Sequence, residues 1–88
     1  MARVLTMVER RVPADGRAAY LRDVDTRRHA AAAARVHFWV FEHDDEPGRF
    51  VEFTEAGSAD DVAALHDGAL PAPLWREVQG GGDARTSG

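Results

Sequence analysis

The 88-residue chain contains no cysteine, no lysine, no asparagine and no isoleucine. Without cysteine, neither a disulfide framework nor a thiolate metal site can form. No apolar run approaches the ~20 residues of a membrane-spanning helix, and the N-terminal stretch has no apolar run long enough for a signal peptide. From these absences we expect a cytoplasmic protein with no membrane partner.

Clustered positive charge is also missing, since all 11 basic residues are scattered arginines and the formal net charge is −4. Nucleic acid is not an expected partner, because phosphate binding needs a clustered basic face. The glycine cluster at 80–82 precedes no helical pattern, which argues against a nucleotide cofactor. The four histidines lack the close spacing of a metal site. We therefore expect no cofactor and no metal.

What is present in abundance is an apolar and aromatic stretch at 35–55, RVHFWVFEHDDEPGRFVEFTE. Two β-branched and aromatic runs flank an acidic Pro-Gly turn, which predicts a hairpin with strands near 35–43 and 49–55. The first run is apolar on both faces and the second on parts of both, so each face of the hairpin needs a cover.

If His43 lies opposite Arg49, the register of this hairpin is determined. One face then carries the pairs His37–Glu55, Trp39–Phe53 and Phe41–Val51. The other face carries Val36, Phe38, Val40, Phe50, Glu52 and Thr54. We expect Glu52 to lie against the helices or to pair with an arginine such as Arg22 or Arg76.

The other elements follow in order along the chain. Residues 3–12 predict a strand, with Val4, Thr6 and Val8 on one face and Leu5, Met7 and Glu9 on the other. A helix is expected from an N-cap at Asp15, with an inward stripe of Ala18, Tyr20, Leu21 and Val24, stopping between Arg28 and Ala33. Ser58 predicts the cap of a second helix that ends at 66–68, and residues 74–78 predict a last strand.

This order predicts an α+β fold of the ferredoxin-like βαββαβ type, with both helices on one face of an antiparallel sheet. Residues 1–79 would form a single domain, and residues 80–88 a flexible C-terminal tail. The uncovered face of the sheet would expose a large apolar patch, so a homodimer joined sheet to sheet is expected.

The leading strand VLTMVERRV, the hairpin VHFWVFEHDDEPGRFVEF and the helix ADDVAALHDG resemble the dimeric α+β barrel superfamily, most closely its antibiotic-biosynthesis-monooxygenase-like branch. The resemblance covers residues 2–79. It implies a homodimer whose two sheets close around a cavity. Members of that superfamily oxidise phenols without metal or flavin, degrade haem, isomerise lactones, cyclise polyketides or have no known activity.

Haem-degrading and some quinone-forming members use an asparagine on a strand near the cavity together with a tryptophan. This chain has no asparagine, and the corresponding first-strand position is Thr6. The departure argues against haem degradation and weakens the case for cofactor-free oxidation. Trp39 and Trp75 could each supply a cavity tryptophan.

The candidate catalytic pair is His37 with Glu55, because a carboxylate can orient an imidazole whose ordinary pKa suits proton abstraction from a phenol. The alternative is a structural cross-strand pair. Candidate substrate-binding residues are Trp39, Phe41, Phe53, Trp75 and His66. The aromatic residues could instead be plain core or dimer packing, and His66 could serve only a helix C-terminus.

Three functions remain open from the sequence. The first is a small oxidoreductase resembling cofactor-independent monooxygenases, acting on an aromatic or polyketide-type small molecule. The second is a non-catalytic dimeric module for ligand binding or assembly. The third is an isomerase or cyclase on the same scaffold.

Overall fold

The structure is a computed structural model, and it describes residues 2–71 and 73–78. The predicted tail at 80–88 lies outside these residues. The elements in chain order are β1 (Val4–Arg11), a 3₁₀ turn (Ala14–Gly16), α1 (Arg17–Ala34), β2 (His37–Glu42), β3 (Arg49–Ala56), α2 (Ala59–Leu65) and β4 (Leu74–Arg76).

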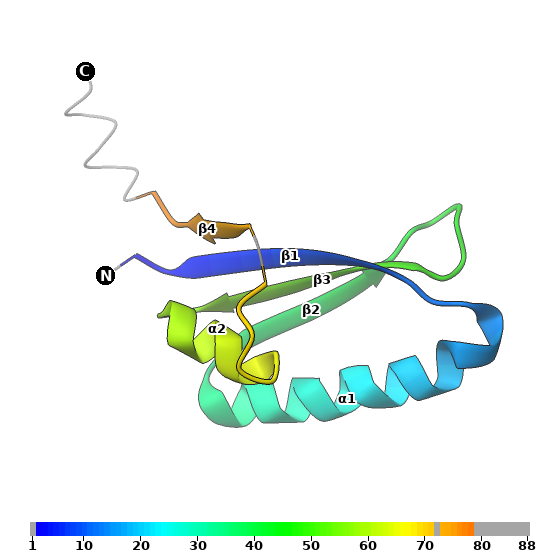
Figure 1. Cartoon of the computed structure of the whole chain (residues 1–88), viewed down its shortest axis with the longest axis horizontal. Helices are drawn as coiled ribbons and strands as arrows, with labels where there is room; N and C mark the ends of the chain where they lie inside the picture. The colour runs from blue at the N-terminus through cyan, green and yellow to red at the C-terminus, as the bar shows by residue number, and fades with distance from the viewer. Residues whose placement is uncertain (1, 72, 79–88) are drawn as a thin grey trace, which may run out of the picture.

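The four strands form one antiparallel sheet in the order β2-β3-β1-β4. Both helices lie on the same side of this sheet, and none of residues 2–71 and 73–78 covers the other side, which we call the uncovered face (Figure 1). The α+β class with an antiparallel sheet and two helices is therefore confirmed. No helix in the described part of the chain combines the length and apolarity needed to cross a membrane.

The register predicted for the hairpin is confirmed. His37 pairs with Glu55, Trp39 with Phe53, and Phe41 with Val51. The backbone N–H of His43 donates to the carbonyl of Arg49 at 2.7 Å, which closes the ladder as expected. Gly48 has a φ of 86°, a left-handed conformation that glycine adopts without strain. The loop length thus determines which side chains share a face.

The start of α1 was predicted wrongly. Asp15 is not the N-cap, because it lies inside the 3₁₀ turn and Gly16 caps the helix without a side-chain hydrogen bond. The N–H of Gly16 bonds the carbonyl of Pro13 at 2.9 Å, so the turn after the proline is already closed before the helix begins.

The end of α1 was also predicted wrongly, since the helix runs to Ala34 and not to a residue between 28 and 33. The alanine run has high helix propensity and contains no breaker. Arg35 stops the helix in a left-handed conformation with a φ of 60°. Its N–H bonds Ala32 at 3.3 Å, and the N–H of Val36 bonds Ala31 at 2.9 Å. These two bonds form a Schellman motif with arginine in the position that glycine usually occupies.

The buried face of α1 differs in part from the predicted stripe. Val24 is buried and Tyr20 half-buried, as expected, but Ala18 and Leu21 are exposed. Leu21 faces a groove of about 320 Å³ beside the edge strand β2, where no further strand covers it. The hydrophobic core lies between the helices and the sheet and consists of Val24, Ala31, Val36, Phe38, Ala56 and Val62.

The second helix begins as the sequence predicts but ends at Leu65, one residue before the predicted end at 66–68, with His66 as its C-cap. The side chain of Ser58 accepts a hydrogen bond from the N–H of Asp61 at 3.2 Å. Gly68 ends the helical segment with a φ of 84°, and its N–H bonds Ala63 at 2.8 Å. The last strand is shorter than predicted, because pairing with β1 ends at Arg76.

Candidate functional site

The uncovered face of the sheet brings together most of the predicted site residues. Pairing across the four strands places His37, Glu55, Leu5 and Trp75 in one row. The next row contains Trp39, Phe53 and Met7, and the third contains Phe41, Val51 and Glu9. Since paired residues of neighbouring strands share a face, these side chains all lie on the side away from the helices.

His37 and Glu55 form the contact that the register predicts. The Nδ1 atom of His37 lies 2.8 Å from Oε1 of Glu55. Because a carboxylate only accepts hydrogen bonds, Nδ1 carries the hydrogen and Nε2 is left as the basic nitrogen. Arg3 donates to the other oxygen of Glu55. Glu55 therefore holds the imidazole in one tautomer while a guanidinium holds the carboxylate.

Large apolar side chains surround this pair and are about half exposed. Met7, Trp39, Phe41 and Trp75 have exposed fractions of 41%, 47%, 57% and 52%. The ring of His37 lies 5.4 Å from that of Trp39, and Phe41 meets Phe53 edge to face at 5.7 Å. This face is thus an aromatic surface with one polar pair at its margin.

Two shallow hollows lie along the uncovered face. One, of about 240 Å³, is bordered by Glu55, Leu5 and Trp75. The other, of about 250 Å³, is bordered by Phe41, Val51 and Arg49. Both are smaller than the ~300 Å³ at which small-molecule pockets usually begin. The single chain does not enclose a ligand beside His37.

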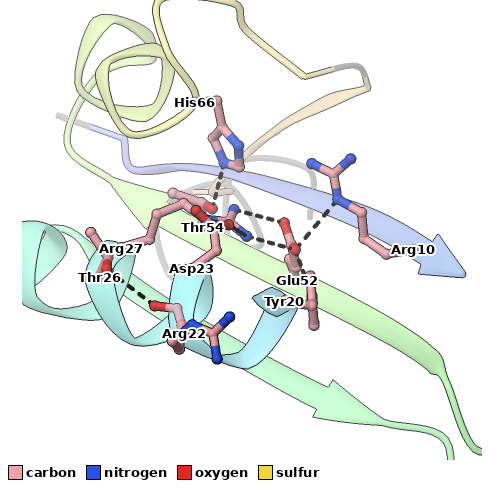
Figure 2. A network of polar contacts seen from close by, with 9 residues as sticks. All are labelled: Arg10, Tyr20, Arg22, Asp23, Thr26, Arg27, Glu52, Thr54 and His66. Atoms are coloured by element: carbon pink, nitrogen blue, oxygen red, sulfur yellow. Dashed lines mark hydrogen bonds and ion pairs between the residues drawn. The ribbon is translucent and has the colours of Figure 1, made fainter. Parts of the chain in front are cut away.

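The opposite, helix-covered face holds a buried ionic cluster (Figure 2). Glu52 is fully buried, and Arg27 donates to its two oxygens at 3.0 and 2.9 Å. The hydroxyl of Tyr20 donates to Oε2 at 2.6 Å, and Nε of Arg10 lies 3.4 Å from the same oxygen. The expected ion pair of Glu52 exists, but its partners are Arg27 and Arg10, not Arg22 or Arg76.

The cluster shifts the ionisation of its members. Burial on its own would raise the pKa of Glu52, but hydrogen bonds from Arg27 and Tyr20 outweigh it, and the pKa lies below its ordinary value. Burial and the bond to Glu52 raise the pKa of Tyr20. The bond to Glu52 raises the pKa of Arg27. Glu52 is therefore a carboxylate and Tyr20 a neutral phenol at neutral pH.

His66 lies on this helix-covered face and not with the other predicted site residues. Its Nε2 is 2.9 Å from the hydroxyl of Thr54. Burial and the positive charge of Arg27 lower the pKa of His66, which makes it a neutral imidazole at neutral pH. The sheet separates it from His37, so the two histidines cannot share one substrate.

A cleft of about 620 Å³ opens between α1, the end of α2 and β1, beside the ionic cluster. Its lining includes Arg10, Tyr20, Arg27 and His66. The sequence did not single out Arg10, Tyr20 or Arg27 as site residues. The available signal was Glu52 itself, because a glutamate on the helix-covered side of a strand must find cationic partners.

Within residues 2–71 and 73–78, no three histidine, aspartate or glutamate side chains converge as metal ligands. His37 contacts Glu55 and His66 contacts Thr54, so each of these two histidines has a protein partner.

Comparison with protein-family models, with curated proteins and with solved structures gives no match to this chain.

Proposed function

We propose that this chain has a ferredoxin-like fold and works as a homodimer of the dimeric α+β barrel type, with the uncovered faces of two sheets packed together. The strand order β2-β3-β1-β4, with both helices on one side, is the arrangement that a split βαβ fold requires. Enclosed aromatic side chains bury ~150–250 Å² each. About half of the surface of Trp39, Phe41 and Trp75 is exposed. These three side chains together therefore expose on the order of 300 Å² of apolar surface. That area is already near the size of the largest apolar patch on an ordinary monomer.

Within that dimer, His37 and Glu55 act as the acid–base pair of an enzyme on a small aromatic molecule. The observation that carries this proposal is the 2.8 Å hydrogen bond between the two side chains beside the aromatic surface. It leaves Nε2 of His37 free to take a proton from a phenolic hydroxyl, while Glu55 stabilises the imidazolium. Trp39, Phe41, Phe53 and Trp75 would stack against the ring of the substrate.

The activity most in keeping with this pair resembles that of cofactor-independent monooxygenases. His37 removes the phenolic proton, and the phenolate reduces O₂. One oxygen atom enters the ring to give the quinone, and the other leaves as water with the two hydrogens lost from the substrate. His37 returns its proton to that water, so the pair ends the cycle unchanged.

The second subunit would complete the pocket. The hollow beside Glu55 and Trp75 measures about 240 Å³ in one chain. A facing sheet would add a second wall and bring it into the usual range for small ligands.

Sedimentation tests the dimer. The wild-type chain is expected to sediment as a dimer at micromolar concentration and Trp39→Asp as a folded monomer, because the substitution places a charge in the interface. Leu21→Asp, which changes an exposed apolar residue on α1, is expected to remain dimeric. A wild-type monomer, or a dimer broken equally by both variants, would reject the proposed interface.

Turnover of a dihydroxynaphthalene under air and under nitrogen tests the chemistry. His37→Gln removes the base and should lower kcat by ~10²–10⁴-fold. Glu55→Gln should also lower kcat. Neither variant should dissociate the dimer. His29→Gln, on the exposed side of α1, is the matched control and should leave kcat unchanged. Full activity of His37→Gln would overturn the assignment. Turnover that is equal under nitrogen would exclude the oxygen-dependent reaction.

A non-catalytic assembly module is the second candidate. The small size of both hollows on the uncovered face favours it. If the two sheets pack without a cavity, the aromatic residues are a dimer seam and no substrate turns over in the experiment above.

A further inference from the structure

The cleft on the helix-covered side is larger than either hollow on the uncovered face. Its volume of about 620 Å³ falls inside the ~300–1,000 Å³ range of small-molecule sites. Apolar side chains form part of its wall and come from β1, from the end of α2 and from the segment that follows it: Val8, Leu65, Ala69, Leu70 and Pro71. Polar groups of Arg10, Tyr20, Arg27 and His66 converge on the same space.

Most of these polar groups already have partners. Both terminal nitrogens of Arg27 bond Glu52, and one also contacts Asp23 at 2.9 Å. Tyr20 donates its one proton to Glu52. These contacts hold the cluster together, so Arg27 and Tyr20 have little left to offer a ligand.

Arg10 is different. It contacts Glu52 through Nε alone, at a long 3.4 Å. Its two terminal nitrogens have no hydrogen-bond partner among residues 2–71 and 73–78, and Figure 2 shows them directed away from Glu52. Arg27 already satisfies Glu52 and also contacts Asp23. Arg10 lines the cleft with two terminal nitrogens whose N–H donors no described residue accepts.

A planar guanidinium fork with two free donors fits a carboxylate in bidentate geometry. Two acids also border the cleft: Asp23, which contacts Arg27, and the exposed Asp67. Their negative charges disfavour a phosphate or a dicarboxylate, so a ligand with a single negative charge fits best beside Arg10. The apolar wall fits a hydrocarbon body attached to that charge.

We propose that this cleft binds a small apolar monocarboxylate, with Arg10 as the residue that recognises the carboxylate. The hydrocarbon part of the ligand lies against Val8, Leu65 and Leu70. The site lies on the other side of the sheet from His37 and does not rest on the proposed homodimer.

Calorimetric titration of the full chain with phenylacetate tests the proposal. We expect one site per chain, with at least tenfold weaker binding of the neutral isostere phenylacetamide and of inorganic phosphate. Arg10→Gln should weaken phenylacetate binding at least tenfold and leave phenylacetamide unaffected. Arg11→Gln is the matched control, because the neighbouring side chain points to the other face of the sheet and should not alter the affinity.

A second variant keeps the test independent of the ionic cluster. Leu70→Trp fills the cleft from an exposed position and leaves Arg10 and Glu52 in place. It should also weaken phenylacetate binding at least tenfold. The proposal is overturned if the wild-type chain does not bind phenylacetate at millimolar concentration, if the amide binds as tightly, or if Arg10→Gln and Leu70→Trp retain full affinity.

Discussion

Arg27 donates to both oxygens of the fully buried Glu52, at 3.0 and 2.9 Å. This pair links the middle of α1 to the central strand β3. Removing one partner of a buried ion pair leaves an uncompensated charge and costs ~3–5 kcal/mol, whereas replacing both partners can be nearly neutral.

The first prediction follows from this asymmetry. Arg27→Leu should lower the free energy of unfolding by ~3–5 kcal/mol in urea titrations. The double variant Arg27→Leu/Glu52→Leu should recover most of that loss, because no charge remains buried without a partner. Arg22→Leu, an exposed arginine of the same helix, is the control and should cost under ~0.5 kcal/mol. A loss below ~1 kcal/mol in Arg27→Leu would show that solvent reaches Glu52 in the native state.

The second prediction concerns the pH dependence contributed by His66, whose pKa is lowered in the folded chain. In the unfolded chain a histidine titrates near ~6.5. As the pH falls below that value, the unfolded chain takes up a proton that the native state resists, so stability decreases. Above pH ~7 both states are neutral and the contribution vanishes.

His66→Gln removes this proton and preserves a partner for Thr54. The slope of unfolding free energy between pH 7 and 5 should become flatter than in the wild-type chain, by up to ~1.4 kcal/mol per pH unit. His29→Gln, which replaces an exposed histidine of α1, should retain the wild-type slope. Identical slopes in the wild type and in His66→Gln would show that the imidazole is solvated in the folded chain.

The third prediction concerns acid stability. Arg17 holds both oxygens of Glu42 at 2.6 and 2.8 Å, and the N–H of Gly48 adds a bond at 2.9 Å. The bond from Arg17, followed by that from Gly48, lowers the pKa of Glu42 to about 2. The stability gained is present above pH 4.5, the ordinary value, and is lost as the pH falls towards about 2.

Glu42→Gln should therefore flatten the decline in unfolding free energy between pH 4.5 and 2, measured by urea titration at fixed ionic strength. Asp45→Asn removes a carboxyl from the loop that follows Glu42 and controls for the change in net charge. If the unfolding free energy of Glu42→Gln and of Asp45→Asn falls equally between pH 4.5 and 2, the ion pair of Arg17 with Glu42 does not persist in solution.

The sequence sufficed for the register of the hairpin and for the pair on its uncovered face. Alternation assigns each strand residue to a face, and the loop between His43 and Arg49 determines the register, so the contact of His37 with Glu55 could be predicted. The partners of Glu52 could not. Arg22 and Arg27 both lie on α1, and only the rotation of the packed helix decides which of them faces the sheet.

Arg76 shows a second limit. It was a reasonable partner for Glu52 by charge, but it pairs with Val4, whereas Glu52 pairs with Val8 further along β1. No local sequence pattern predicts where along β1 the strand β4 pairs. For the same reason, the cleft and its arginine could not be predicted.

The last prediction concerns Arg35, which ends α1 although no glycine or proline marks a stop there. A non-glycine residue in the left-handed conformation is strained by ~1 kcal/mol, since its Cβ approaches the following carbonyl. Arg35→Gly should raise the free energy of unfolding by ~0.5 kcal/mol, because relief of this strain exceeds the entropy that glycine adds to the unfolded chain. Ala30→Gly, an exposed position inside the same helix, should lower it by ~1 kcal/mol. Thermal and urea unfolding should therefore show a gain in stability for Arg35→Gly and a loss for Ala30→Gly. A loss of stability in both variants would mean that Arg35 does not hold the left-handed conformation that ends the helix.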